Sequence, residues 1–346
     1  VKVASSFEES LAGVAKVTNL TDKEMVEMDK TIQGMSKRIP ATYEEIAKGV
    51  EIAGRLGIEG SDNMVKFTET MMQLGVATEM EMESAADSLA RLMNIFGTSH
   101  SDIDRMGSTL VQLGNNLATS EGEILSLTMR LASSASLLGM TEAETMGLAG
   151  AMSALGITAE MGGNSMSKFM TKMYTDVQNG GENAVKWANL TGMSIEELAN
   201  LTENDMAKAL QVAIKGMGEY AEEGGNLDQM LRDLGISEAR QLDVLKRLAG
   251  GYEVMEDAIS MASKEWDTNT ALVDEANIRY GTFLAQMKIF YNRLRIIFKN
   301  IGNVFMEVLI DIANAITPLI DKIEKWTQSL IDADTGAVTP LGRALG

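Results

Sequence analysis

Residues 137–160, LLGMTEAETMGLAGAMSALGITAE, contain the pattern that decides the fold. Leu138-Gly139 ends one apolar stretch, and Met140 can fold back onto it. Thr141 and Glu144 then have the spacing of a capping box, in which each side chain bonds the backbone of the other. The next apolar stretch again ends in Leu155-Gly156-Ile157. These residues therefore predict a helix of about three turns between two glycine stops.

The same punctuation recurs along the chain. Further glycine stops are expected at Leu56-Gly57-Ile58, Leu74-Gly75-Val76 and Leu234-Gly235-Ile236, and further capping boxes at Thr42–Glu45, Thr78–Glu81, Ser120–Glu123 and Ser194–Glu197. Apolar residues recur at helical spacing, and strand-like alternation does not occur. Four stripes are clear: Met64, Phe67, Met71, Leu74; Ala86, Leu89, Met93, Phe96; Ile124, Leu127, Leu131, Ala135, Leu138; and Met166, Phe169, Met173, Val177. The predicted class is all-α, a compact array of short helices followed by long amphipathic, coiled-coil-like helices.

We expect four parts: an N-terminal helical arm (1–39), a multi-helix core domain (40–262), a long amphipathic region with a heptad seam (263–332) and a flexible tail (333–346). Two glycine clusters, Gly162-Gly163-Asn164-Ser165 and Gly224-Gly225-Asn226, are interpreted as hinges or caps because no strand precedes them and no lysine follows, as a phosphate loop would need.

The composition excludes several classes of function. The 346 residues include no cysteine and a single histidine, so disulfides, thiolate metal sites and multi-histidine metal centres are ruled out. The formal net charge of −19 argues against a specific nucleic-acid partner. Neither cofactor nor metal is expected. The 26 methionines are interpreted mainly as core residues, or as a sign of helices that pack in more than one setting.

No catalytic residues are predicted. His100 lies in Gly97-Thr98-Ser99-His100-Ser101-Asp102, where neighbours along a loop do not converge as a catalytic triad does. The acidic pairs Glu44-Glu45, Glu196-Glu197 and Glu222-Glu223 suit helix ends or a solvated face better than acid–base catalysis. The chain is expected not to be an enzyme.

The stretch Ala276 to Met306 differs from the rest because it holds five basic residues and no acidic one. Within it, apolar residues alternate spacings of four and three, which is typical of a helix that packs on a partner helix. This predicted oligomer seam consists of Phe283, Met287, Phe290, Leu294, Ile297, Ile301, Val304 and Val308. The expected partner is the chain itself, as a trimer. The register breaks at Asp311, and Thr317-Pro318 predicts a kink or a new helix.

The basic residues of this stretch have two interpretations. Lys288, Arg293, Arg295 and Lys299 are predicted to contact either an acidic partner or a membrane surface. A bilayer-spanning helix is not expected, because the most apolar candidate, Ile301 to Ile320, carries Glu307 and Asp311.

Several stretches together resemble the core domain of phage tail tape measure proteins. They run in the same order over about residues 7 to 175 and include Phe7-Glu8-Glu9-Ser10-Leu11, Met35-Ser36-Lys37-Arg38-Ile39-Pro40, Phe67-Thr68-Glu69-Thr70-Met71, Leu92-Met93-Asn94-Ile95-Phe96-Gly97 and Thr119-Ser120-Glu121-Gly122-Glu123-Ile124. Trp266-Asp267-Thr268 and Thr317-Pro318-Leu319-Ile320 resemble the family more loosely.

The resemblance implies a structural protein of a phage or prophage tail that sets tail length during assembly and leaves during DNA ejection. It implies tail tube and tail tip proteins as partners, and a location inside the tail tube or tip after assembly in the host cytoplasm. An unbroken helix of this length would span roughly 520 Å, but the glycine stops predict a compact part of a longer protein. The absence of an initiating methionine fits that expectation. The alternative function is a membrane-active helical effector or pore-former, which the basic aromatic stretch would serve.

Overall fold

The computed structural model describes residues 2–299, and this part of the chain is helical and contains no strand. The all-α prediction is confirmed. The helices, in order, are α1 (Lys2–Val17), α2 (Asp22–Ser36), α3 (Tyr43–Arg55), α4 (Ser61–Ala77), α5 (Met82–Phe96), the 3₁₀ helix η1 (His100–Asp102), α6 (Ile103–Asn116), α7 (Glu121–Leu137), α8 (Glu142–Ala154), α9 (Ala159–Asn179), α10 (Glu182–Thr191), α11 (Ile195–Asn204), α12 (Met206–Glu222), α13 (Leu227–Asp233), α14 (Ala239–Gly250), α15 (Tyr252–Thr268) and α16 (Ala271–Tyr280). A further helical segment, residues 283–299, is called the strap helix below.

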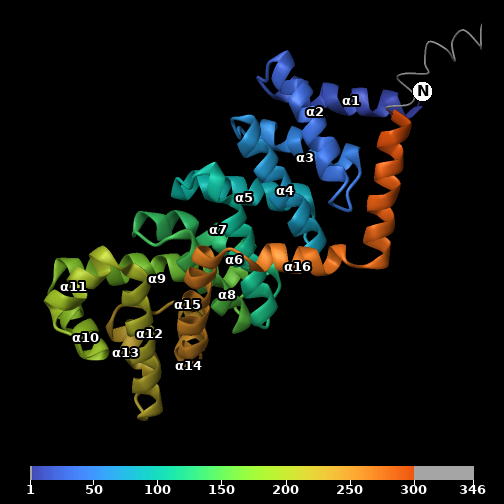
Figure 1. Cartoon of the computed structure of the whole chain (residues 1–346). Helices are drawn as coiled ribbons and strands as arrows, with labels where there is room; N and C mark the ends of the chain where they lie inside the picture. The colour runs from blue at the N-terminus through green and yellow to red at the C-terminus, as the bar shows by residue number, and fades with distance from the viewer. Residues whose placement is uncertain (1, 300–346) are drawn as a thin grey trace, which may run out of the picture.

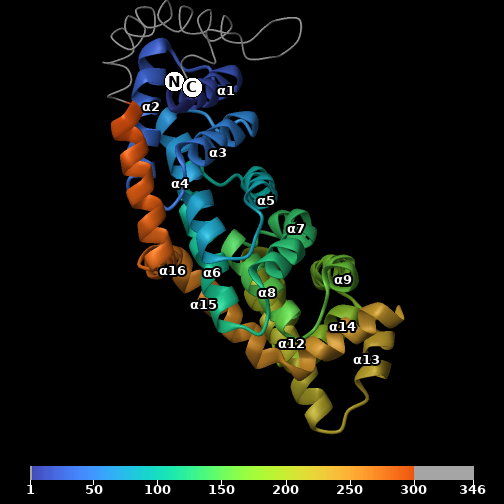
Figure 2. The same cartoon turned by 90° about the vertical axis from the view of Figure 1, so that its right-hand side faces the viewer.

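The helices form an elongated stack. It begins at α1–α3 and descends through α4–α8 to α9–α14 at the opposite end (Figures 1 and 2). The chain then turns back: α15 packs on α8 and α6, and α16 packs on α6 and α4. The strap helix runs beside α2–α4 and brings the end of the described chain back to its beginning (Figure 2).

One buried apolar cluster extends through the stack, from Phe7 to Ile296. The four predicted stripes lie in it, with only Phe96 and Leu138 partly buried. Most of the methionines are buried there as well, so their interpretation as core residues is confirmed. Because α1 packs on α3, residues of the predicted N-terminal arm share this core. The division into these four parts stays a prediction.

Four of the five glycine stops are confirmed. Gly57, Gly139, Gly156 and Gly235 have φ between 73° and 80°, the left-handed region that favours glycine. The residue after each is buried, and its N–H bonds a carbonyl five residues earlier, as in Met140 N to Ala135 O at 3.0 Å. The fifth, at Gly75, is wrong, because α4 continues through it to Ala77.

The caps follow the sequence signals with one exception. Full capping boxes form at Thr42, Thr141 and Ser194, and Ser120 accepts a hydrogen bond from the Glu123 N–H. The box predicted at Thr78 is wrong: Thr78 closes the C-terminus of α4, and Glu81 instead caps α5 by accepting from the Ser84 N–H at 2.8 Å.

The interpretation of Gly162-Gly163 as a hinge or cap is also wrong. Both glycines lie buried inside α9, where it packs on α7. A Cβ at Gly162 would lie 2.5 Å from a methyl of Ile157, and one at Gly163 would lie 2.6 Å from Arg130 Cβ. These glycines therefore allow close helix packing. At Gly224, where φ is 89°, the cap prediction is confirmed, and Asn226 caps α13.

Candidate functional site: the strap helix and its acidic bed

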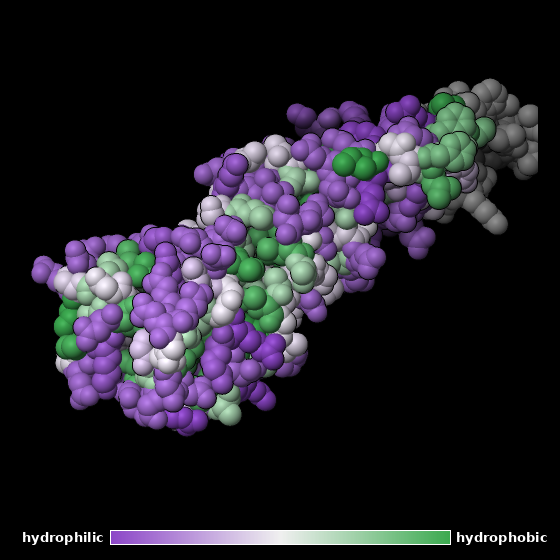
Figure 3. Space-filling view, turned by 90° about the horizontal axis from the view of Figure 1, so that it is seen from below, coloured by the Kyte–Doolittle hydropathy of each residue, from purple (hydrophilic) through white to green (hydrophobic). Residues whose placement is uncertain are grey.

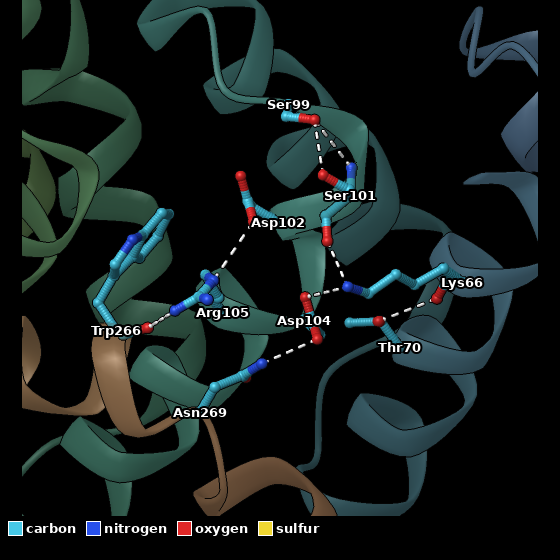
Figure 4. A network of polar contacts seen from close by, with 9 residues as sticks. All are labelled: Lys66, Thr70, Ser99, Ser101, Asp102, Asp104, Arg105, Trp266 and Asn269. Atoms are coloured by element: carbon cyan, nitrogen blue, oxygen red, sulfur yellow. Dashed lines mark hydrogen bonds and ion pairs between the residues drawn. The ribbon is translucent and has the colours of Figure 1, made fainter. Parts of the chain in front are cut away.

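The strap helix is positioned by a polar junction between α4, α6 and the α15–α16 corner (Figure 4). The Asp104 carboxylate forms an ion pair with Lys66 Nζ at 2.9 Å and accepts a hydrogen bond from Asn269 Nδ2 at 2.8 Å. Asn269 has φ of 55°, the one left-handed non-glycine residue in the part described, and it forms the corner. Arg105 forms an ion pair with Asp102 and donates a hydrogen bond to the Trp266 carbonyl.

A buried carboxylate completes this corner. Glu265 Oε1 accepts from the backbone N–H groups of Thr270 at 2.7 Å and Ala271 at 2.8 Å, and from Ser108 Oγ at 2.7 Å. The Ser108 oxygen in turn accepts from the Leu272 N–H at 3.1 Å. Glu265 and Ser108 thus satisfy the free N–H groups at the start of α16, which fixes the direction of α16 and so the place where the strap helix begins.

The inner face of the strap helix has few apolar groups. Ile289 and Ile296 are its buried large apolar side chains, at 5% and 3% exposed. Between them, buried Asn292 donates through Nδ2 to the carbonyls of Ser36 at 3.1 Å and Ala41 at 2.7 Å. Asn292 Oδ1 is buried without a hydrogen-bond partner among the described residues, so this contact is only half satisfied.

Cations of the strap helix contact an acidic surface on α2 and α3, here called the acidic bed (Asp29, Glu44 and Glu45). Arg295 forms two hydrogen bonds with Glu44, at 2.7 and 3.0 Å. Lys288 pairs with Glu45 at 3.1 Å, and Lys299 pairs with Asp29 at 3.2 Å.

The fourth cation, Arg293, acts on a helix end. It donates through Nε and Nη2 to the Lys37 carbonyl, at 3.1 and 2.9 Å. Lys37 is the C-cap of α2, where carbonyls lack helical partners and a positive charge is favourable. All four basic residues predicted to meet an acidic partner or a membrane therefore contact this chain's own N-terminal helices.

The pairing also changes the electrostatics of the acidic bed. Burial alone would raise the pKa of Glu44, but hydrogen bonds from Arg295, from its own backbone N–H and from Ser6 outweigh it and lower that pKa. The pKa of Glu45 is lowered in the same way, since the Thr42 N–H and Lys288 outweigh its burial. Both carboxylates are thus held in the charged form that the strap helix needs.

Two aromatic rings lie under the end of the strap helix. Phe7 and Tyr43 are buried and stacked, with ring centroids 4.0 Å apart. Lys299 Nζ lies 4.8 Å from the Phe7 centroid, and Arg295 Cζ lies 5.5 Å from it, both within the range of cation–π attraction. Burial and a hydrogen bond to Asp29 raise the pKa of Tyr43, so its hydroxyl stays a donor.

The outward face of the strap helix carries the predicted seam. Phe283, Met287, Phe290 and Ile297 are 77%, 46%, 54% and 50% exposed, and Leu294 is intermediate. At about 100° per residue these positions lie opposite Asn292. Exposed Leu284, Tyr291 and Phe298 repeat every seven residues beside the seam and widen it. Figure 3 shows apolar colour at the end of the molecule that carries this helix.

The remaining seam positions, Ile301, Val304 and Val308, lie outside the described residues, as do the register break at Asp311 and the kink at Thr317-Pro318. The role of the seam stays a prediction. Sequence reasoning missed the inner face: Ile289, Asn292 and Ile296 form a second stripe at spacings of three and four, opposite the first. It also missed the acidic bed, because no local pattern links residue 44 to residue 295.

The features considered for catalysis have structural roles. His100 opens η1, where Ser99 Oγ accepts from the Ser101 N–H, and Asp102 pairs with Arg105 at 3.3 Å. Within residues 2–299, no group of three or more histidine and carboxylate side chains is placed to hold a metal ion. Over the same residues, no helix combines the length and apolarity needed to cross a bilayer.

The helical stack, its polar corner and its strap define an all-α protein in which residues far apart in the sequence are joined by polar contacts. The family model of the phage-related minor tail proteins matches residues 29–264, which is more than half of the chain. The chain therefore belongs to the phage-related minor tail protein family, and it is a virion-associated phage tail protein. Comparison with curated proteins and with solved structures gave no significant match.

Proposed function

We propose that the chain is a segment of a tail tape measure protein, which sets tail length during assembly and leaves the tail during DNA ejection. The observation that carries this proposal is the match of residues 29–264 to a phage minor tail family, together with the ordered motifs between residues 7 and 175 that resemble the tape measure core. Its role is structural rather than enzymatic, inside the tail tube or tip, with tail tube and tip proteins as partners.

Release during ejection tests this proposal. Purified virions are triggered to eject, and the chain is quantified by mass spectrometry in the empty particles and in the supernatant. A tape measure segment is present in intact virions and lost from empty ones, whereas the major tail tube protein is retained as the internal control. A chain that stays with the empty tail would contradict release.

We further propose that several copies associate through the seam, as a trimer. The supporting observation is that Phe283, Met287, Phe290 and Ile297 face outward at heptad spacing, and that the spacing continues in the sequence to Val308. A third apolar position in each heptad is typical of helices that contact more than one neighbour. The basic residues of the strap helix, in contrast, contact residues of the same chain. The seam is then the face that remains for a second copy.

Light scattering of the full chain tests the seam. The wild type is expected to be trimeric, and a variant with Phe283→Ser and Phe290→Ser is expected to be monomeric. Leu137→Ser is the matched control, because Leu137 is 87% exposed on α7, remote from the strap helix, and this variant should stay trimeric. A monomeric wild type, or a seam variant that stays trimeric, would contradict the proposal.

A membrane-active function is the second candidate, and the exposed phenylalanines of the strap helix favour it. Against it, Lys288, Arg295 and Lys299 are paired within the chain, so they are not free to attract anionic lipid. Vesicles of phosphatidylethanolamine and phosphatidylglycerol loaded with a self-quenched dye distinguish the two. Rapid leakage that Phe290→Ser abolishes would support the membrane function, and no leakage would remove it.

A further inference from the structure

The strap helix is attached in an unusual way. A helix on a protein surface ordinarily turns its apolar side inward. Here the buried large apolar side chains are Ile289 and Ile296, whereas seven large apolar side chains point outward: Phe283, Leu284, Met287, Phe290, Tyr291, Ile297 and Phe298. The strap helix is therefore held with little hydrophobic burial, and most of its attachment is polar.

The polar attachment is mainly ionic, and its three ion pairs differ in exposure. The side chains of Lys288 and Glu45 are 42% and 51% exposed, those of Arg295 and Glu44 are 19% and 31% exposed, and those of Lys299 and Asp29 are 13% and 23% exposed. The exposed pair contributes little by itself, whereas the two less exposed pairs contribute more; all three weaken as salt screens them, the exposed pair most. The buried Asn292, with Oδ1 unpaired, adds a cost to the closed position.

The connection to the strap helix allows it to swing. Only Gly281 and Thr282 separate it from α16, whose Leu272 and Ala276 are buried in the body. The hydrogen bonds across this connection are local: Thr282 Oγ1 to the Arg279 carbonyl at 2.9 Å, and Gln286 Nε2 to the Tyr280 carbonyl at 2.7 Å. The long-range polar contacts of the strap helix go to residues 29–45.

We propose that residues 283–299 form a releasable strap, closed by charge pairing of Lys288, Arg295 and Lys299 with the acidic bed, and opened by a swing about Gly281-Thr282. Opening uncovers Asp29, Glu44 and Glu45 beside the stacked rings of Phe7 and Tyr43, and it moves the outward apolar face away from the body. The device follows from the contacts of this chain alone and does not depend on the proposed tail function.

Spin-label distances in the full chain test the strap. Because the chain has no cysteine, labels attach only where one is introduced. A strap pair uses Val26→Cys on α2 and Tyr291→Cys on the strap helix, both exposed; a body pair uses Val26→Cys and Leu137→Cys. At about 0.05 M salt the strap pair should give one short distance. At 1 M salt, where the Debye length is about 3 Å, a longer distance should appear, with the open-to-closed ratio rising about tenfold.

Four variants separate charge pairing from general charge effects. Lys288→Gln, Arg295→Gln and Lys299→Gln combined should open the strap at low salt. The matched control neutralises three cations that form exposed ion pairs elsewhere, Arg130→Gln, Lys168→Gln and Lys246→Gln, and should stay closed. Exchanging the charges, with Glu44→Arg and Arg295→Glu, should keep the strap more closed than Arg295→Glu alone.

Several results would overturn the proposal. One is a strap-pair distance that stays short both in 1 M salt and in the triple strap variant, because Ile289, Asn292 and Ile296 would then hold the helix alone. A second is a body-pair distance that changes together with the strap pair, because that indicates unfolding rather than a swing. A third is a control variant that opens as far as the strap variant.

Discussion

The guanidinium of Arg295 forms two hydrogen bonds with the carboxylate of Glu44, joining residues 251 positions apart in the sequence. Glu44 lies in the first turn of α3, where a carboxylate also complements the helix dipole. The pair therefore links the last described helix to one of the first. It brings the end of the described chain into contact with the N-terminal end of the helical stack.

Arg295→Gln should weaken this closure without unfolding the body. A detached segment of 17 residues is too short to be a stable helix on its own, so its amides become exposed to exchange. We expect hydrogen exchange of residues 283–299 to accelerate roughly fivefold to tenfold, the effect of about 1 kcal/mol for a half-buried pair. Exchange in α8 should not change. Equal protection of the strap helix in variant and wild type would contradict the role of the pair.

Acid should release the strap helix. Glu44 faces Arg295 and Ser6, Glu45 faces Lys288 and Thr42, and Asp29 faces Lys299 and the Tyr43 hydroxyl. Because the closed state lowers the pKa values of Glu44 and Glu45 below 4.5, the stabilisation is complete above about pH 4.5 and is lost as the pH falls through the lowered values.

Exchange of residues 283–299, measured at pH 7, 5 and 3.5 and corrected for the intrinsic exchange rate, checks this prediction. Protection should be equal at the first two values and fall at the third. In the variant with Glu44→Gln and Glu45→Gln, Glu45→Gln keeps the capping box of Thr42, and the pH dependence should be much weaker. A wild-type profile that is flat down to pH 3.5 would show that these carboxylates do not hold the strap helix.

Alanine substitution at two glycines inside helices is expected to change stability in opposite directions. A Cβ at Gly147 in α8 would lie 2.6 Å from Ile259 Cα and 2.8 Å from the Ala258 carbonyl oxygen of α15. These are backbone atoms that cannot move aside separately, so Gly147→Ala should lower the free energy of unfolding by about 1–3 kcal/mol. At Gly75 in α4 a Cβ would meet no atom within 4 Å, so Gly75→Ala should raise the free energy of unfolding by about 0.5–1 kcal/mol.

Urea denaturation of both variants measures these changes, and each variant serves as the control for the other. Equal effects of the two substitutions would contradict the close approach of α8 and α15.

Glu265→Ala should be one of the most destabilising substitutions in the C-terminal half. It removes the acceptor of the Thr270 and Ala271 N–H groups and the partner of Ser108. Leaving these partly buried donors unpaired should cost about 2–4 kcal/mol in urea denaturation. Asp267→Ala, at an exposed position two residues away, should change stability by less than about 0.5 kcal/mol. Similar losses in the two variants would argue against the buried corner.

The sequence predicted those features of the fold that depend on residues close together in the chain. Gly139, Met140 and Thr141 interact within one helix end, so their roles could be read from spacing alone. The roles of Gly162 and Gly163 could not be read in this way, because these glycines make room for Met152 of α8 and Arg130 of α7, which approach from other helices. Thr78 has the spacing of a capping box, but α4 extends to Ala77, which makes Thr78 its C-cap. The next helix, α5, begins at Met82, so Glu81 is its N-cap.

The candidate site could likewise be predicted only where it depends on residues close together in the chain. The heptad spacing from Phe283 to Ile297 predicted a continuous helical face, and the structure places it outward. Which face of that helix meets the body depends on Ser36, Ala41 and Glu44, which lie more than 240 residues away. Periodicity carries no information about such pairings. The sequence therefore leaves two interpretations for Lys288 and Arg295, contact with an acidic partner or contact with a membrane surface.

The length of phage tails tests the central claim most directly. Tails from a phage or prophage that lacks the gene for this chain are measured by electron microscopy and compared with tails from the wild type and from the complemented strain. If the chain belongs to the tape measure, tails are missing or vary widely in length without it, and complementation restores one uniform length. Tails of uniform, wild-type length in the absence of the chain would contradict this function.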